Sequence, residues 1–395
     1  MNSAPPVAAR APIFSAPLGS GRVSVFRSIG DLSEATQVRF FGTHWKDQRF
    51  LRAVEQTLTD DVEHACFYLE DEAGEPLALQ PGFVVRQDLA LGTPPALTRV
   101  VRALRTRWPH FLRPRMLMIG CFAGEAHWPA DAHSALAARA LREGAELFAK
   151  QRGIRMITFK EFPTHARDAF AEARGYARVP SYPGVRLPIA FASFDAYLET
   201  LSKPTRKNLR RKFRESAAVG GVEMQVTSEP SPATLDEIFA LYVQVYERST
   251  VRFEKLTRAY FATIAAELSD RARFFLWRAG GRLVAFNLCF VHEEILYDDY
   301  LGLDYAVAHD LHLYFLTFRD VLQWVIAHGL RAYYSTPLSY EPKLHLRFTL
   351  VPLDLYVRHT SPWMNPLYRR LARALGPISG DPLLTRFPNS HELLA

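Results

Sequence analysis

A dense basic segment just past the middle of the chain constrains its architecture most. Within SKPTRKNLRRKFR, at 202–214, seven of the twelve residues from Lys203 to Arg214 are Lys or Arg. The chain holds 48 basic and 41 acidic residues, so removing those seven leaves 41 of each. The whole formal excess of +7 can therefore be assigned to this segment.

The same segment has the signals of an amphipathic helix. Ser202 is an expected N-cap and Pro204 falls in the first turn, while apolar positions recur every three or four residues at Leu201, Thr205, Leu209, Phe213 and Ala217. This pattern predicts one buried face and one free cationic face. A solvated surface is the ordinary explanation of such a charge run, but its position between two similar halves favours ligand binding.

Arg206 and Arg210 are the leading candidates for ligand contacts on this helix. They are four residues apart and share one face, and a guanidinium fork matches phosphate or carboxylate oxygens at two points. Lys203 and Asn208 are further candidates in the same segment.

Length and composition indicate two domains. A chain of 395 residues exceeds one ordinary core, and 48% hydrophobic residues suffice to fill two. No run of eighteen apolar residues and no charged-then-apolar leader is present, so we expect a cytoplasmic protein without a membrane span. The basic excess suggests an anionic partner but does not distinguish nucleic acid, phosphates, a coenzyme or an anionic membrane surface.

No metal site is predicted. Cys66, Cys121 and Cys289 lie far apart in apolar stretches and are interpreted as reduced core residues. Asp298 and Asp299 stand on a predicted strand, where neighbouring side chains face opposite sides and cannot share one ion.

The order of predicted elements is the same in both halves. Each half reads as a strand, two helices, a hairpin, a strand, a long helix ending at a glycine, and a further strand. In the first half these are 22–27, 31–41, 47–58, 64–69, 77–85, 116–122, 132–151 and 154–160; in the second they are 222–227, 231–247, 257–268, 273–278, 282–292, 295–303, 311–328 and 331–335. The stretch 87–114 is predicted to be an insertion in the first half.

A short motif supports an internal duplication. Tyr176 begins a segment with Val179-Pro180 and then Val185-Arg186, and Phe348 begins one with Val351-Pro352 and then Val357-Arg358. Both fit aromatic-x-x-Val-Pro-x4-Val-Arg, which two copies of one α/β unit explain better than chance.

This element order is that of the GNAT acyltransferase fold, and two such units around a basic helix resemble the FemAB/FemX transferases and the related BioF2-like acyltransferases. The resemblance is carried by KPTRKNLRR at 203–211, by YEPKLHLRF at 340–348, and by Pro352 with YVRH at 356–359. It implies two tandem GNAT-like domains. The predicted organisation is a flexible arm at 1–20, a first, binding domain at 21–192, a linking helix at 193–220, a second, catalytic domain at 221–360 and a tail at 361–395.

The resemblance also implies a donor site. In a GNAT enzyme two central strands separate, and backbone N–H groups at the following helix start receive the pyrophosphate of acyl-CoA. Here that place is predicted at Tyr305, Ala306, Val307, Ala308, His309 and Asp310. The usual glycine-rich loop is absent from the second half, and Arg347 stands where the family has a glycine.

Lys343 is the leading catalytic candidate. The resemblance points to it as the cation nearest the oxyanion that forms when an amine attacks an acyl carbonyl. Its counterpart 172 residues earlier is Ala171, which fits one catalytic and one binding unit. It is predicted to lie in a loop, so that Lys343→Met would leave the melting temperature unchanged. Tyr340 and Asp299 are the next candidates, while Tyr246 and Tyr300 are expected at the acceptor pocket.

The sequence therefore predicts an N-acyltransferase that moves an acyl or aminoacyl group from acyl-CoA or aminoacyl-tRNA to an amine. Cell-envelope or peptidoglycan-precursor metabolism is the expected setting. Its partners would be an anionic or tRNA-linked donor and an amine acceptor, with no stable nucleic-acid complex. The alternative is a non-enzymatic protein that binds nucleic acid or an anionic surface on a duplicated GNAT scaffold.

Overall fold

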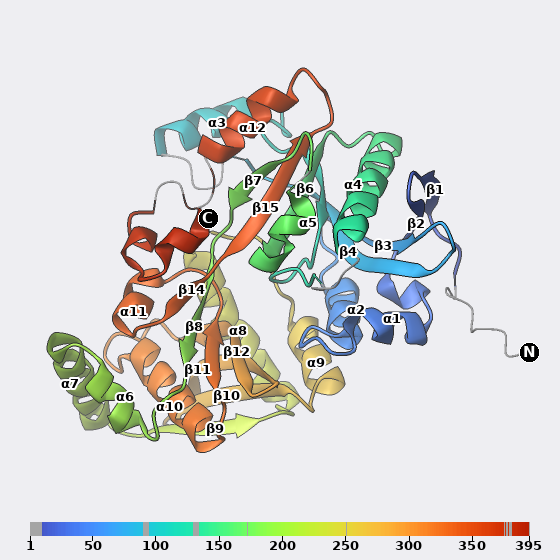
Figure 1. Cartoon of the computed structure of the whole chain (residues 1–395). Helices are drawn as coiled ribbons and strands as arrows, with labels where there is room; N and C mark the ends of the chain where they lie inside the picture. The colour runs from blue at the N-terminus through green and yellow to red at the C-terminus, as the bar shows by residue number, and fades with distance from the viewer. Residues whose placement is uncertain are drawn as a thin grey trace, which may run out of the picture. The chain divides into compact units, whose positions relative to one another are not determined.

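The computed structural model describes residues 10–89, 95–128, 134–171, 173–249, 251–374, 376, 378 and 381–394 (Figure 1). They belong to two compact α/β units. Unit 1 comprises 1–181 and 352–380, and unit 2 comprises 182–351 and 381–395. Among the described residues, no helix combines the length and the apolar character needed to span a bilayer.

The sheet of unit 1 has the order β1-β2-β3-β4-β5-β6-β15-β7. Neighbouring strands are antiparallel except for β5 and β6, which are parallel. The strands are β1 (Phe14–Leu18), β2 (Gly21–Phe26), β3 (Val62–Glu70), β4 (Pro76–Arg86), β5 (Arg115–Ile119), β6 (Met156–Pro163), β7 (Ala177–Pro180) and β15 (Leu353–His359).

The sheet of unit 2 has the order β14-β8-β13-β12-β11-β10-β9. Here β12 and β13 form the one parallel pair among the described strands of this unit. The strands are β8 (Gly184–Pro188), β9 (Val222–Thr227), β10 (Ala272–Ala279), β11 (Arg282–His292), β12 (Ile295–Leu303), β13 (Ala332–Ser335) and β14 (Thr349–Val351).

The capping residues predicted from the sequence stand at the observed helix starts. Asp47 caps α2 by accepting from the backbone N–H of Arg49 and Phe50, and Ser202 caps α7 by accepting from Thr205. The helices of unit 1 are α1 (Glu34–Phe41), α2 (Gln48–Thr57), α3 (Pro95–Arg107), α4 (Ser134–Gln151), α5 (Arg167–Phe170) and α12 (Asn365–Ala374), and those of unit 2 are α6 (Phe194–Thr200), α7 (Lys203–Val219), α8 (Pro232–Arg248), α9 (Arg258–Glu267), α10 (Leu313–Ala327) and α11 (Tyr340–His345).

The two sheets repeat one plan, and each contains a strand from the other half of the chain. In unit 1, β15 lies between β6 and β7, antiparallel to both; in unit 2, β8 lies between β13 and β14 in the same way (Figure 1). The motif that indicated the duplication falls on these strands, since Val179 and Val351 are in β7 and β14, and Val185 and Val357 are in β8 and β15. The tandem GNAT-like architecture is thus confirmed.

The exchange follows from the length of the connections. Only Pro352 separates β14 from β15, and one residue cannot reverse the chain into a hairpin. The ring of Pro352 also fixes φ near the extended range, so the chain continues forward and β15 joins the sheet of unit 1.

The observed units differ from the predicted boundaries for this reason. The first predicted domain, 21–192, contains β8, which belongs to unit 2, and the second, 221–360, contains β15, which belongs to unit 1. The predicted linking helix at 193–220 is α6 and α7, both inside unit 2. The tail at 361–395 is divided between the two units.

Part of the predicted flexible arm is ordered. Phe14 in β1 pairs with Val25 in β2, and its ring lies edge-on against Phe148 of α4 at 5.7 Å. Ser15 and Ser24 face each other in the same ladder. The low charge and high Ala and Pro content of 1–20 predicted a flexible arm, whereas the structure has a short edge strand there. Residues 1–9 lie outside the described part.

Gly184, the first residue of the exchanged strand β8, tests this packing. A Cβ atom there would overlap the phenol end of Tyr334, a buried side chain whose ring lies 5.5 Å from that of Tyr297. We expect Gly184→Ala to lower the free energy of unfolding by ~1–3 kcal/mol, the usual cost of overpacking. Gly19→Ala is the control, because the nearest contact of its new methyl would be Glu143 Oε2 at 3.9 Å. Equal urea-unfolding midpoints for the two variants would contradict the prediction.

Candidate functional site

The central strands of unit 2 separate as a GNAT fold requires. Parallel pairing of β12 with β13 runs from Ile295 opposite Ala332 to Asp298 opposite Ser335, and β12 then continues to Leu303 paired with β11 only. A bulge lies at the same point, because Leu288 pairs with Tyr300 whereas Cys289 pairs with Asp298. The strands therefore diverge directly after Asp298.

Asp298 forms the centre of a buried polar cluster at this divergence. Its Oδ1 accepts from Asn287 Nδ2 at 2.8 Å, and its Oδ2 accepts from the Tyr333 hydroxyl at 2.7 Å. Burial raises the pKa of Asp298, while these two hydrogen bonds and the charge of Lys343 favour the ionised form. The sequence pattern raised Asp298 only as a possible metal ligand. It did not predict that the Asp298 carboxylate would be the centre of this hydrogen-bonded cluster.

Lys343 lies in the short helix α11 and not in a loop. Its side chain is buried, and Nζ donates to the carbonyls of Thr336 at 2.6 Å and Leu338 at 2.9 Å. Burial lowers its pKa to about 8, and the nearby Asp298 charge acts in the opposite direction. Leu338 and Ser339 have φ of 73° and 52°, so Lys343 holds a left-handed turn directly after β13.

Tyr340 and Asp299 are also buried. The Tyr340 hydroxyl donates to the carbonyl of Pro183 at 2.9 Å, which fixes the residue before β8. Asp299 lies at the bulge, where its backbone carbonyl accepts from Thr336 Oγ1 at 3.2 Å. Lys343, Tyr340 and Asp299 thus surround the end of β13, and their catalytic roles remain predictions.

The structure brings Tyr246 and Tyr300 into one aromatic cluster. Tyr242 lies between them, with ring centroids 5.9 Å from Tyr246 and 6.3 Å from Tyr300. The Tyr300 hydroxyl donates to Glu254 Oε1 at 3.1 Å. This cluster packs beside β12, beyond the divergence.

The predicted donor-binding turn follows β12 and leads into α10. The N–H groups of Tyr305, Ala306 and Val307 are already hydrogen-bonded within the protein. They donate to Gln244 Oε1, Asp304 Oδ1 and the Asp304 carbonyl, respectively. The next three N–H groups have no acceptor among the described residues; they belong to Ala308, His309 and Asp310. Three consecutive open donors before a helix form a site suited to an anion.

The basic helix α7 packs beside α10, which begins at this turn. Its residue Glu215 accepts from His312 Nε2 at 2.8 Å and from Arg211, and these hydrogen bonds lower the pKa of Glu215. Lys212 Nζ lies 3.6 Å from the centre of the Phe315 ring. Arg211 and Lys212 therefore lie beside the start of α10. Arg248 and Arg282 contact the turn itself, because Arg248 lies 4.2 Å from the centre of the Tyr305 ring and Arg282 pairs with Asp304 at 2.9 Å. Arg211 and Lys212 were not among the predicted site residues.

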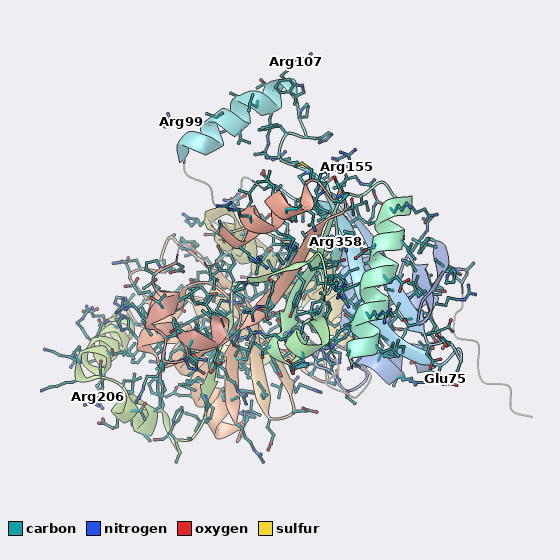
Figure 2. The ribbon with its side chains drawn as sticks, turned by 45° about the horizontal axis from the view of Figure 1, so that its top comes forward. Glu75, Arg99, Arg107, Arg155, Arg206 and Arg358 are labelled. Carbon is teal, nitrogen blue, oxygen red and sulfur yellow. The ribbon has the colours of Figure 1, made fainter. Side chains whose placement is uncertain are left out.

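The predicted contacts Arg206 and Arg210 lie in the first half of α7 and face α6. Both pair with Glu199 of α6, at 3.0 and 3.1 Å, so the cationic face is partly neutralised. Figure 2 labels Arg206 on α7. Asn208 accepts from Arg211, and Lys203 is exposed in the first turn. Exposed ion pairs are weak, so this arrangement leaves both arginines able to exchange Glu199 for a ligand.

The corresponding point of unit 1 is closed and apolar. There the parallel pair β5–β6 ends with Ile119 opposite Phe159, where unit 2 has Asp298 and Ser335. Two buried lysines bind the backbone of the following turn. Lys160 Nζ donates to the Gly124 carbonyl at 2.8 Å, and Lys46 Nζ donates to the Glu125 carbonyl at 3.4 Å. Among the described residues, the polar cluster and the open turn are found in unit 2; residues 129–133, which precede α4, lie outside the described part.

Comparison with known proteins agrees with this geometry. Residues 203–341 match the family model described as acetyltransferase (GNAT) domain. The chain carries a GNAT acyltransferase domain. The match starts at Lys203, the first residue of α7, and includes the divergence and the turn before α10. A search of curated proteins finds no match for this chain.

Several solved structures are similar to this chain at low identity. FemX is 11% identical with a TM-score of 0.49 and covers 82% of this chain and 93% of its own. L-PGS from Bacillus licheniformis is 13% identical with a TM-score of 0.48, over 83% and 95% of the two chains. A tandem GNAT protein from the clavulanic acid biosynthesis pathway is 11% identical with a TM-score of 0.46, over 80% and 88%.

The buried amine of Lys343 predicts a pH-dependent stability. Its folded pKa of about 8 is below the ordinary value of 10.5, so between these values the unfolded chain binds more protons and stability rises with pH. Below pH 8 both states are protonated and the burial cost is fully present. We therefore expect the stability of the wild type relative to Lys343→Met to increase between pH 7 and 9.5, with a slope approaching ~1.4 kcal/mol per pH unit.

This replaces the expectation that Lys343→Met leaves the melting temperature unchanged. Urea unfolding of both proteins at several pH values measures the difference directly. Lys203→Met is the control, since Lys203 is exposed and should show no such slope. Parallel stability curves for wild type and Lys343→Met would show that the Lys343 amine titrates as it does in solvent.

Proposed function

We propose that the protein transfers an acyl group from acyl-CoA to an amine and that unit 2 is the catalytic unit. The observation that carries the proposal is the row of open N–H groups at Ala308, His309 and Asp310, directly after the diverging strand of the matched domain. These donors suit the pyrophosphate of acyl-CoA, which acts here as a co-substrate.

The proposed reaction is attack of a neutral amine on the thioester carbonyl. A C–N bond forms, the C–S bond breaks, and the amine proton is lost as the thiol leaves. Lys343, when protonated, has a third N–H beyond the two that it donates to Thr336 and Leu338, and we assign that proton to the developing oxyanion. Asp299 is the candidate for accepting the amine proton, Tyr340 is a further candidate catalytic residue, and the Tyr246–Tyr300 cluster is the candidate acceptor surface.

An aminoacyl-tRNA donor would serve the same chemistry, because its ester carbonyl would also be attacked by an amine. We favour acyl-CoA because the open donors form a small site at one turn, whereas tRNA would require an extended phosphate-binding surface. A cytoplasmic setting and an acceptor from cell-envelope or peptidoglycan-precursor metabolism complete the proposal. The three cysteines are free thiols in the interior, which suits a reducing compartment.

A carboxylate placed at the turn tests the donor site. Ala308→Glu puts a negative charge beside the open N–H groups, so we expect the KM for acetyl-CoA to rise about tenfold or more through repulsion of the pyrophosphate. Ala308→Gln has nearly the same shape without the charge and is the matched control, with KM within about threefold of wild type. The assay is release of free thiol from acetyl-CoA with a panel of primary amines.

Two results would contradict the proposal. The first is the absence of any amine-dependent thiol release, together with no stabilisation of the protein by coenzyme A in a thermal melt. The second is an equal effect of Glu and Gln at position 308. Binding of nucleic acid, with an affinity that falls linearly on a log–log salt plot, would instead favour the non-enzymatic alternative.

A further inference from the structure

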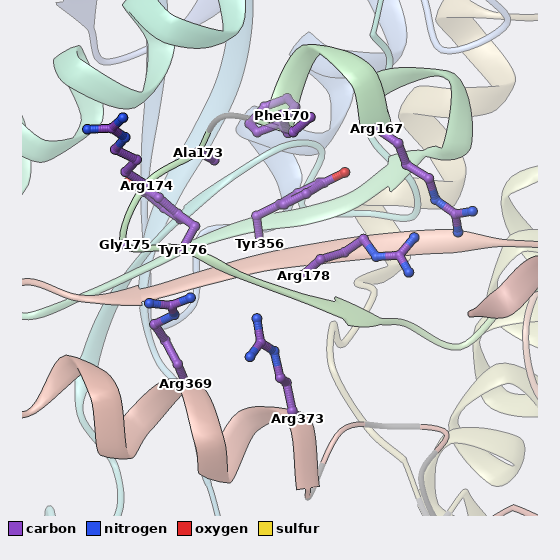
Figure 3. A pocket seen from close by; sticks show the side chains of 11 residues that line it. Arg167, Phe170, Ala173, Arg174, Gly175, Tyr176, Arg178, Tyr356, Arg369 and Arg373 are labelled. Atoms are coloured by element: carbon purple, nitrogen blue, oxygen red, sulfur yellow. The ribbon is translucent and has the colours of Figure 1, made fainter. Parts of the chain in front are cut away.

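Unit 1 contains an arginine-rich cavity that the proposed acyl transfer does not use. Its volume is about 620 Å³, within the usual range for small-molecule sites. We call it the arginine pocket after the side chains that contribute most of its polar lining, which are Arg167, Arg174, Arg178, Arg369 and Arg373 (Figure 3). The described residues that line it include no Asp or Glu.

The arginines come from segments far apart in the sequence. Arg167 belongs to α5, Arg178 to β7, and Arg369 and Arg373 to α12, one turn apart on the same face of that helix. Figure 3 shows the last two rising from α12 toward Tyr356 and the segment around Gly175. The fold therefore gathers these cations, and no local sequence pattern does so.

The positive charge of the pocket is only partly compensated. Arg167 donates to the buried Asp354 at 2.6 Å, and Arg178 is 4.0 Å from the same carboxylate. In the part of the chain that the structure describes, no carboxylate lies within ion-pair distance of Arg174, Arg369 or Arg373. The Nε atom of Arg369 is buried with no hydrogen-bond acceptor among those residues. A bound anion would satisfy this donor and relieve the repulsion between the guanidinium groups.

We propose that the arginine pocket binds a phosphate monoester. A phosphate dianion offers three oxygens and about two negative charges, which several guanidinium forks can share in two-point contacts. The pocket is in unit 1, and the proposal does not rest on the acyl transfer assigned to unit 2.

The phosphate could belong to a soluble metabolite or to a lipid headgroup, and α12 bears on this choice. Beside the arginines this helix and its approach expose a group of apolar side chains, which are Trp363, Met364, Leu367 and Leu371. Trp363 is 90% exposed. Apolar and cationic side chains together on one surface helix are typical of segments that lie in a membrane interface.

The test measures binding of one headgroup in two forms. Glycerol 3-phosphate is titrated into the full chain by calorimetry, and binding to vesicles of phosphatidylcholine with or without phosphatidic acid is measured by flotation. The test variant is Arg369→Gln/Arg373→Gln. The control is Arg155→Gln/Arg370→Gln, which removes the same charge from unit 1 outside the pocket lining (Figure 2). Circular dichroism checks that both variants are folded.

We expect the test variant to bind at least tenfold more weakly than wild type, and the control within about threefold. Binding of glycerol 3-phosphate with this pattern would identify a soluble ligand. Binding only to vesicles with phosphatidic acid, with the same pattern, would identify a lipid headgroup. Failure of wild type to bind either form, or an equal loss in the two variants, would overturn the proposal.

Discussion

Everything at the proposed catalytic site depends on how β13 is held. This strand pairs with β12 for only four residues, from Ala332 to Ser335, and its other edge is occupied by β8 from the first half of the chain. Because β8 fixes β13, the divergence of β12 occurs at a defined residue, Asp298. The short connection through Pro352 directs the reciprocal strand into unit 1, so both units gain a central strand from the other half.

The duplication has produced two similar folds with different chemistry. At the end of the parallel pair unit 1 has Ile119 and Phe159, and unit 2 has Asp298 and Ser335. A buried carboxylate needs partners, which Asn287 and Tyr333 supply. In unit 1 the corresponding space is apolar, and buried lysines hold the following turn closed. Under the proposed function, such differences leave the reactive site in unit 2 and a binding role to unit 1.

Much of this plan could be predicted from the sequence. The Val-Pro repeat indicated the duplication, and caps such as Asp47 and Ser202 placed helices within a few residues. The strand exchange was not foreseen, because the motif shows that two strands repeat but not which sheet each one joins. The length of the Pro352 connection was the available signal. The burial of Lys343 could not be inferred, since the chain places the Thr336 and Leu338 carbonyls around it only after folding.

The arginine pocket, too, could not be predicted from the sequence. Arg167 and Arg373 are about two hundred positions apart, and single arginines in a sequence carry no sign that they converge. The compact charge run at 203–214 attracted the first interpretation, yet Arg206 and Arg210 of that run pair with Glu199. In the described part of the chain, the pocket arginines without a carboxylate partner are Arg174, Arg369 and Arg373, and only the tertiary structure brings them together.

Hydrogen–deuterium exchange with and without coenzyme A tests the central claim most directly, because it reports the protection of backbone N–H groups in each short segment of the chain. The account predicts slower exchange for peptides spanning the turn after β12, at 305–315, and little change for the corresponding turn of unit 1 at 120–128. Protection of the unit 1 turn, or no protection in either unit at a saturating concentration, would contradict the assignment of the donor site to unit 2.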